Sequence, residues 1–323
     1  MSASRAPAVE HGFPSHRAGT RRAVVTIGNF DGVHRGHQTL LTRLTTAAGE
    51  RDAESVVVTF DPHPRCVLLP DQCPLSLTTL EEKHDLIGGV GVDRFIVLPF
   101  TRDMSSWTAE HFCDRLLAGV DVTRFVVGHD FAIGNERGGD IPWLRKYGES
   151  HGFDVAVVEP VEGDGVVISS SRVRAVLLNG ELAEANHLLG HPYFVDGWVE
   201  HGDKIGSRIG YPTANLSLAP NKCLPERGVY VTWMEVAGTW HMAATNVGYR
   251  PTFGGDRPTV QAFLLDFAGD IYRQRVRLAF VHRLRDEIVY PGADALVAQI
   301  ARDVVNTKEM LERQSPPAVL SRG

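Results

Sequence analysis

The sequence has no hydrophobic run long enough to span a bilayer, which argues against a transmembrane helix. Residues 1–21 are basic but lack the apolar segment of a secretory signal, so we expect a disordered leader, with a transit peptide as the alternative. The four cysteines form no Cys-x-x-Cys pair, which disfavours a disulfide framework or a zinc site and favours reduced thiols in a cytoplasmic protein. The net charge of −6 argues against general binding to nucleic acid or to a membrane surface.

From residue 22 to about residue 160, short β-rich segments alternate with helical ones. The strand-length Val/Ile/Phe runs, typical of strands buried on both faces, are AVVTIG, SVVVTF, RFIVLPF, RFVVGHD and FDVAVVEP. Between the first two, Leu40, Leu41 and Leu44 fall on one helical face. The alternation predicts βαβ units, and therefore an α/β domain with a Rossmann-like parallel sheet covered by helices on both faces.

The second half of the chain has a different pattern. The segments YFVDGWVEHG, GVYVTWMEV, TWHMAATNVG, TVQAFLLDF and RVRLAFVHRL follow one another with turns rich in Gly, Pro and Asp. They predict antiparallel strands, most simply a small β-barrel, followed by a terminal helix over residues 294–314. We therefore expect an α/β domain over 22–186, a barrel domain over 187–308 and a flexible tail over 309–323.

The first candidate site is the stretch VTIGNFDGVHRGHQTLL, residues 25–41, which joins the first strand to the first helix. Gly32 and Gly36 permit close backbone approach to a ligand, and the helix beginning near His37 offers unpaired amides to an anion. His34 and His37 are placed to stabilise charge that develops on a phosphate. The alternative is a tight connector with two solvated histidines.

The second candidate site is ISSSRVR, residues 168–174. Ser169 and Ser170 stand where a helix is expected to begin, and Arg174 lies one turn further on. Taken alone, the segment is more often a serine cap beside a solvated arginine. Because it accompanies the histidine stretch at another strand end of the same domain, the pair favours binding of a polyphosphate.

The third candidate site is GYPTAN, residues 210–215, which follows the glycine-rich turn HGDKIGSRIG. Thr213 and Asn215 carry oxygen donors of the kind that hold Mg²⁺ and phosphate oxygens. The alternative is a polar β-turn before the next strand.

The ordered motifs TIGNFDGVHRGHQ, VTFDPHP, VVGHDFAIGNERGGD and ISSSRVR resemble the nucleotidyltransferase module of prokaryotic bifunctional riboflavin kinase/FAD synthetases. The resemblance continues through IGSRIGYPTANL, RGVYVTW, NVGYRPTFGG and LRDE, and covers roughly residues 22–305. It implies that the first domain transfers AMP from ATP to FMN. It also implies that the barrel phosphorylates riboflavin with ATP, and that both reactions use Mg²⁺.

The resemblance also implies roles for individual residues. In the first domain it places these residues at the ATP site: Gly28, Phe30, Asp31, His34, Gly36 and His37. The triphosphate is assigned to Ser169, Ser170 and Arg174, and positions near flavin and nucleotide to Asp61 and Asp130. Asp61 is equally readable as a turn former before Pro62, and Ile133 stands where the family usually has Phe. In the barrel, Thr213 and Asn215 are implied to hold Mg–ATP beside a phosphate loop containing Gly206 and Gly210.

The kinase half departs from the family at the general base. The family has glutamate in the motif T-V-E-x-(F/H), whereas this chain reads TVQAF with Gln261. An amide orients a hydroxyl but accepts no proton, so we expect weakened riboflavin phosphorylation. Further departures from the family are Ile205 and Ser207 in the phosphate loop and Arg273, which stands where glycine usually follows tyrosine. Carboxylates that could replace the missing general base are Glu200, Asp203 and Asp256.

Two alternatives to a bifunctional enzyme follow from these departures. One is an adenylyltransferase with a non-catalytic flavin-binding barrel, and the other is a non-enzymatic flavin sensor. The paired histidines of the first domain weigh against the sensor, because a sensor has no use for imidazoles aimed at a phosphate. The flavin variant used, the preferred nucleotide and the oligomeric state are not determined by the sequence.

Overall fold

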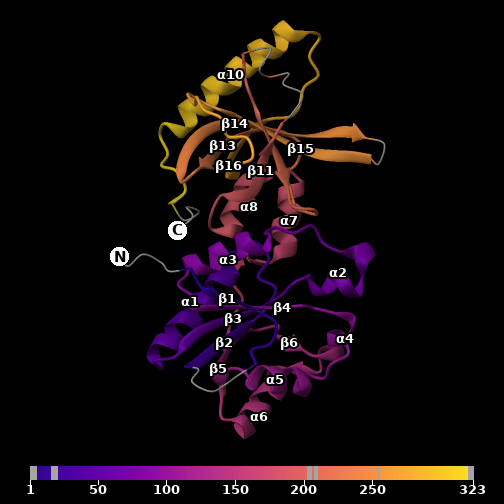
Figure 1. The fold of residues 1–323 in the computed structure, drawn as a ribbon, viewed down its shortest axis with the longest axis vertical. Helices are drawn as coiled ribbons and strands as arrows, with labels where there is room; N and C mark the ends of the chain where they lie inside the picture. The colour runs from indigo at the N-terminus through magenta and orange to yellow at the C-terminus, as the bar shows by residue number, and fades with distance from the viewer. Residues whose placement is uncertain (1–5, 16–20, 202–205, 207–209, 253–254, 319–323) are drawn as a thin grey trace. The chain divides into compact units, whose positions relative to one another are not determined.

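The computed structural model describes residues 6–15, 21–201, 206, 210–252 and 255–318 (Figure 1). The chain divides into two compact units. Unit 1 comprises the described residues within Met1–Leu75 and Lys83–Ser169, and unit 2 those within Ser76–Glu82 and Ser170–Arg322. No helix in the described part of the chain has the length and apolar character needed to cross a membrane.

Unit 1 contains a six-stranded sheet with the order β1-β4-β3-β2-β5-β8, and every neighbouring pair is parallel. Its strands are β1 (Ala8–His11), β2 (Arg22–Ile27), β3 (Glu54–Phe60), β4 (Arg94–Leu98), β5 (Asp121–Gly128) and β8 (Asp154–Val158). The predicted parallel sheet is therefore confirmed. The prediction of a disordered leader is wrong for Ala8–His11, because these residues hydrogen-bond along β4 at the edge of the sheet.

The strands of unit 1 are connected by helices and short hairpins. The helices are α1 (Arg35–Glu50), α2 (Pro64–Leu68), α3 (Leu80–Gly89, which crosses the unit boundary), α4 (Arg102–Ser105), α5 (Ala109–Leu117) and α6 (Ile141–His151). The shorter elements are η1 (Pro70–Gln72), η2 (Asn135–Arg137), β6 (Ala132–Ile133), β7 (Gly139–Asp140), β9 (Glu162–Gly163) and β10 (Val166–Val167). Leu40, Leu41 and Leu44 of α1 are buried, as their spacing predicts.

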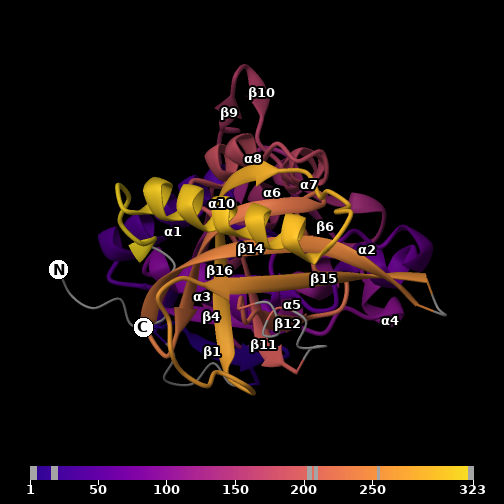
Figure 2. The same cartoon turned by 90° about the horizontal axis from the view of Figure 1, so that it is seen from above.

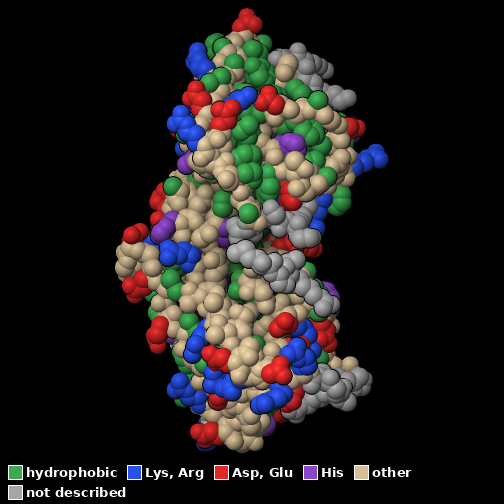
Figure 3. Space-filling view, turned by 90° about the vertical axis from the view of Figure 1, so that its left-hand side faces the viewer, with side chains coloured by type: hydrophobic (Ala, Val, Ile, Leu, Met, Phe, Trp, Pro, Cys, Tyr) green, Lys and Arg blue, Asp and Glu red, His purple; other side chains and the backbone are tan. Residues whose placement is uncertain are grey.

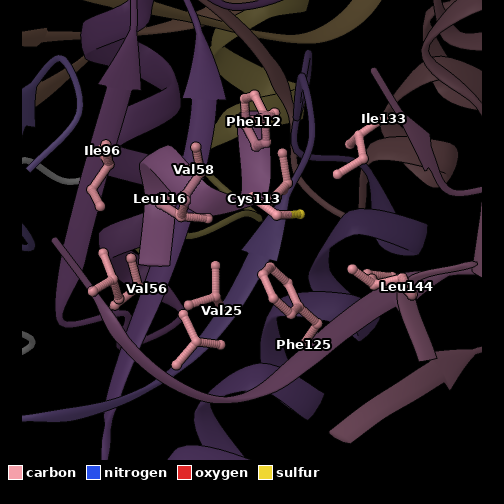
Figure 4. Packing of buried hydrophobic residues seen from close by; sticks show 14 of the residues in the cluster. Val25, Val56, Val58, Ile96, Phe112, Cys113, Leu116, Phe125, Ile133 and Leu144 are labelled. Atoms are coloured by element: carbon pink, nitrogen blue, oxygen red, sulfur yellow. The ribbon is translucent and has the colours of Figure 1, made fainter. Parts of the chain in front are cut away.

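The core of unit 1 lies between the sheet and its helices (Figure 4). Strand residues such as Val25, Val58 and Phe125 pack against Phe112 and Leu116 of α5. The strands are hydrophobic along their length because both faces of a parallel sheet are covered. Ile133, for which the resemblance suggests phenylalanine, is buried in this cluster.

One expectation about the cysteines is wrong. Cys66 and Cys73 form a disulfide, whereas the absence of a Cys-x-x-Cys pair predicted reduced thiols. Cys66 lies in α2 and Cys73 directly follows η1, and the tight fold of these two short helices brings their Cα atoms to 4.2 Å. Cys113 and Cys223 are free and buried.

Unit 2 contains a closed barrel of antiparallel strands with the order β11-β12-β15-β14-β13-β16, which confirms the predicted architecture. Its strands are β11 (Tyr193–Glu200), β12 (Ala214–Leu218), β13 (Gly228–Val236), β14 (Thr239–Thr252), β15 (Gly255–Leu264) and β16 (Arg275–Arg285). Helices α7 (Ser170–Leu178) and α8 (Leu182–Leu189) precede the barrel. The terminal helix α10 (Ala293–Leu311) runs across it, against β13 and β14 (Figure 2).

A buried ion pair ties two strands of the barrel together. Arg277 of β16 donates to both carboxylate oxygens of Asp196 of β11, at 2.7 and 2.9 Å. Arg277 is only 1% exposed. Asp196 also pairs with Arg275 at 3.1 Å, so this carboxylate joins β11 to two arginines of β16.

Candidate functional site

The carboxyl ends of the central strands of unit 1 bring several predicted residues to one edge of the sheet. Gly28 directly follows β2, Asp61 directly follows β3, and Asp130 lies two residues after β5. The chain order reverses beside β2, since β3 and β4 lie on one side of it and β5 and β8 on the other. Ligands of open α/β sheets bind at such a switch point.

The loop after β2 has an unusual backbone. Phe30, Gly32 and Val33 have φ values of 49°, 81° and 40°, in the left-handed region that side chains other than glycine rarely adopt. The Phe30 ring is buried, and a Cβ at Gly28 would lie 3.1 Å from it. Strained residues of this kind persist where the surrounding structure holds them, and they cluster at functional sites.

The two histidines of this loop lie at the start of α1. His34 is the N-cap residue, and its Nδ1 accepts a hydrogen bond from the backbone N–H of His37 at 3.4 Å. The two rings are stacked, and the Phe30 ring meets His37 edge-on with centroids 5.2 Å apart. A Cβ at Gly36 would lie 3.2 Å from the His34 ring and 3.8 Å from the Ile168 carbonyl oxygen. Glycine at 36 therefore leaves room for the ring and for the segment that leads to Ser169.

The environment of both imidazoles favours their neutral form. Burial lowers the pKa of His34 to about 4, although Asp31 opposes the shift. Burial also lowers the pKa of His37 well below its usual value, and the neighbouring His34 and Lys83 add to this effect. The Nδ1 atom of His37 is buried and has no hydrogen-bond partner in the described part of the chain. The alternative of two solvated histidines is therefore wrong.

Lys83 on α3 is a charged group at this site that the sequence did not reveal. Its side chain is 8% exposed, and burial lowers its pKa, opposed by the carboxylates of Asp31 and Asp61. It also acts electrostatically on His37. A lysine in LEEKHDL is ordinarily solvated, and no sequence pattern links it to loops fifty residues upstream.

The remaining predicted residues of the first site fall on both sides of the unit boundary. Ser169 is the last residue of the segment Lys83–Ser169 of unit 1, whereas Ser170 and Arg174 belong to α7 of unit 2. Arg174 is partly buried, and its Nη2 lies 3.4 Å from Ser171 Oγ. Asp130 is exposed at its strand end, where its carbonyl oxygen accepts a hydrogen bond from Arg137 at 2.7 Å.

Unit 2 contains a cavity of about 580 Å³, a size typical of small-molecule sites. It brings together four of the predicted residues, Gly206, Thr213, Asn215 and Gln261. A Cβ at Gly206 would lie 2.2 Å from the carbonyl oxygen of Tyr211, so only glycine fits there. Gly210, at φ +86°, does not line the cavity.

A row of amide side chains crosses one wall of this cavity. Gln261 of β15 is the register partner of Asn215 on β12 and of Asn246 on β14. Gln261 Nε2 donates to Asn215 Oδ1 at 2.9 Å, and Asn246 Nδ2 donates to Glu287 Oε1 at 3.0 Å. Glu287 also lines the cavity. Its motif, LRDE, is part of the family resemblance, but no pattern in the sequence assigns Glu287 a role.

The structure places some, but not all, of the carboxylates that could replace the general base and of the other residues that depart from the family. Glu200 pairs in register with Asn215 but is exposed and does not line the cavity. Asp203, Ile205 and Ser207, and the side chain of Asp256, lie outside the described residues. Arg273 has a φ of +62°, which accounts for the glycine that the family usually has there.

The donors present fit the magnesium site that the resemblance implies at Thr213 and Asn215. Among the described residues there is no group of three or more His, Cys, Asp or Glu that suits a metal ion. Mg²⁺ does not need such a group, because it usually takes one or two protein oxygens together with phosphate oxygens and water. Thr213 supplies a hydroxyl and Asn215 an amide oxygen at the cavity wall.

The fold and the two sites define a nucleotidyltransferase-type α/β unit joined to a flavokinase-type barrel. Residues 16–172 match the family model described as FAD synthetase, and residues 189–311 match the one described as riboflavin kinase. The chain belongs to the bifunctional riboflavin kinase/FMN adenylyltransferase family.

Known bifunctional riboflavin kinase/FMN adenylyltransferases are similar to this chain over nearly their whole length. The Pseudomonas fluorescens enzyme is 39% identical over 299 residues, which is 92% of this chain and 94% of that protein. The Escherichia coli enzyme is 38% identical over 297 residues, 91% and 94% of the two chains. A crystal structure described as a macrolide-efflux protein from Streptococcus pneumoniae superposes with a TM-score of 0.84 at 32% identity, over 95% of this chain and 99% of that one.

Proposed function

We propose that this chain makes FAD from riboflavin in two ATP-dependent steps. The barrel transfers the γ-phosphoryl group of ATP to riboflavin, and the α/β domain transfers AMP from a second ATP to the resulting FMN. The observation that carries the second step is the stacked pair of buried, neutral imidazoles at the switch point of a parallel sheet. We place the adenylyltransferase domain at residues 22–186 and the kinase domain at 187–308.

In the adenylylation step, a phosphate oxygen of FMN attacks the α-phosphorus of ATP. The bond from that phosphorus to the bridging oxygen breaks, and pyrophosphate leaves with the electron pair. Neutral His34 and His37 donate hydrogen bonds to the phosphate oxygens on which charge develops, and the Lys83 ammonium is a buried cation beside them. Ser169, Ser170 and Arg174 hold the triphosphate, Arg174 by its guanidinium. Mg²⁺, when bound, neutralises phosphate charge in both reactions.

In the phosphorylation step, Thr213 and Asn215 hold the phosphates of ATP beside Gly206. The mouth of the cavity offers apolar surface for a flavin ring, since Tyr249, Ile288 and Val289 line it and are 43%, 53% and 97% exposed. On the face of unit 2 that Figure 3 draws, exposed hydrophobic side chains lie among charged ones. Large exposed apolar side chains beside a cavity are typical of a ligand-binding mouth.

Product chromatography tests the proposal. Purified protein is incubated with Mg–ATP and either riboflavin or FMN, and flavins and pyrophosphate are measured over time. We expect FMN to give FAD and pyrophosphate in equal amounts, and riboflavin to give FMN more slowly. Failure to form FAD from FMN would contradict the assignment of unit 1.

One observation favours a second candidate, an adenylyltransferase whose barrel binds flavin without phosphorylating it. Gln261 occupies the position of the family's general base, and an amide accepts no proton. Riboflavin that binds to the protein but yields no FMN, while FMN is converted to FAD, would identify this second function.

A further inference from the structure

We propose that Glu287 is the proton acceptor for the ribityl 5′-hydroxyl of riboflavin in this chain, in place of the carboxylate that Gln261 lacks. The inference rests on the kinase activity proposed for the barrel. It concerns a catalytic residue, since the carboxylate would touch the primary alcohol that reacts with ATP.

The position of the carboxylate is the first argument. Asn246 is the direct register partner of Gln261, and opposed residues on antiparallel strands have their Cβ atoms about 5 Å apart. Asn246 Nδ2 holds Glu287 Oε1 at 3.0 Å. The carboxylate of Glu287 is therefore one side chain away from the family's base position, on the same cavity. A proton acceptor must lie within hydrogen-bond reach of the hydroxyl or one water molecule away from it, so the proposal requires the 5′-hydroxyl to bind between these two positions.

Gly248 supplies a second geometric argument. A Cβ built at this residue would lie 2.5 Å from Glu287 Oε1 and 3.2 Å from Asn246 Nδ2. The carboxylate thus lies directly over the backbone of β14, in space that any larger residue would occupy. Asn246 thus holds the carboxylate by a hydrogen bond, and the absence of a side chain at Gly248 leaves the space that the carboxylate occupies.

The other carboxylate of the cavity is already engaged. Among the described lining residues, Asp303 and Glu287 carry carboxylates. Asp303 is 4% exposed and accepts hydrogen bonds from Arg285 Nη2 at 2.6 Å and from Gln299 Nε2 at 3.0 Å. An ion pair of this kind stabilises the attachment of α10 and holds both oxygens. Glu287 is left as the carboxylate that faces the cavity from an exposed loop.

The step balances without any further reactant. The 5′-oxygen of riboflavin attacks the γ-phosphorus of ATP, and its O–H bond breaks as the proton passes to the Glu287 carboxylate. The bond between the γ-phosphorus and the β,γ-bridging oxygen breaks, and ADP leaves with that electron pair. Glu287 then releases the proton to water. Gln261 keeps the role of holding Asn215, to which it donates.

The test compares four proteins at saturating Mg–ATP: the full-length chain and its Glu287→Gln, Gln261→Glu and doubly substituted forms. Riboflavin phosphorylation is followed by chromatography, riboflavin binding by quenching of flavin fluorescence, and FMN adenylylation serves as the folding control. For Glu287→Gln we expect a drop in the kcat of phosphorylation of about a hundredfold or more. Riboflavin affinity should stay within about twofold and FAD formation should be unchanged. Adding Gln261→Glu should restore the lost turnover.

A supporting variant is Gly248→Ala, which displaces the carboxylate without removing it and should lower the kcat of phosphorylation with FAD formation retained. Undiminished kcat in Glu287→Gln overturns the inference, as does loss of kcat that Gln261→Glu does not restore. If the unmodified chain makes no FMN but Gln261→Glu does, Glu287 is not a base although the barrel is a kinase. If neither protein makes FMN, the kinase function itself fails.

Discussion

The imidazole rings of His34 and His37 are stacked with their centroids 3.7 Å apart and their planes 17° from parallel. This contact joins the N-cap of α1 to its first turn and places two neutral donors at the end of the central strand. It forms because the left-handed residues of the preceding loop turn the chain sharply and Gly36 leaves room for the His34 ring.

The first prediction concerns His37. His37→Ala removes a preorganised donor to the transition state, so we expect the kcat of FMN adenylylation to fall by about a hundredfold or more. The KM for ATP should change less. Thr39→Ala, an exposed position on the same helix, is the matched control and should leave both constants unchanged. Near-normal turnover of His37→Ala would remove the histidine pair from the mechanism.

The second prediction concerns pH. Burial lowers the pKa of His34 from 6.5 to about 4, so the unfolded chain takes up a proton at a higher pH than the folded one. The stability that comes from keeping His34 neutral is complete above pH 6.5 and is lost as the pH falls toward 4. The shift of the His34 pKa from 6.5 to about 4 corresponds to about 3 kcal/mol of the free energy of unfolding.

The variant His34→Asn tests this pH dependence, because asparagine retains an N-cap acceptor but does not titrate. Urea midpoints followed by tryptophan fluorescence between pH 7 and pH 4.5 should fall more steeply for the unmodified protein than for the variant. Parallel curves would mean that His34 titrates normally.

The third prediction concerns Arg174. Its guanidinium is expected to bind the triphosphate in the ground state and the transition state alike, so Arg174→Ala should raise the KM for ATP in adenylylation more than it lowers kcat. Arg172 on the same helix is the control, since it pairs with Glu184 at 2.7 Å. Arg172→Ala should reduce thermal stability and leave the KM for ATP as it is. An unchanged ATP dependence in Arg174→Ala would assign this arginine to the surface of α7.

The fourth prediction concerns Lys83. Lys83→Met keeps the length of the side chain and removes its charge, which should lower the kcat of adenylylation by about tenfold or more. Thermal stability should stay the same or rise, because a buried ammonium with a lowered pKa is itself costly to keep charged. Lys83→Arg should retain more activity than Lys83→Met. Equal activity of all three proteins would make Lys83 a purely structural residue.

The fifth prediction concerns Gln261. Gln261→Glu is nearly isosteric and restores a carboxylate between Asn215 and Asn246, so riboflavin phosphorylation should rise by about tenfold or more. FMN adenylylation provides the internal reference and should not change. A rate no higher than that of the unmodified chain would show that the amide at this position is not what limits the kinase.

Local sequence determined the elements and the chemistry of this protein. Continuous Val/Ile/Phe runs predicted the buried parallel strands, because strands covered on both faces need apolar side chains throughout. The spacing of Leu40, Leu41 and Leu44 predicted the buried face of α1, and the stretch from His34 to His37 predicted where this helix begins. Each of these signals lies within a few residues, where backbone periodicity and capping decide the outcome.

Only the tertiary structure decided which distant residues meet. Lys83 on α3 interacts electrostatically with Asp31, Asp61 and His37, and no local pattern encodes that proximity. Ala8–His11, which the sequence predicts to be part of a disordered leader, forms a strand that pairs in parallel with β4. Glu287 accepts a hydrogen bond from Asn246, which is the register partner of Gln261, and that register depends on how six strands close on one another. These contacts follow from long-range packing, so the sequence supplied the side chains and the fold supplied their neighbours.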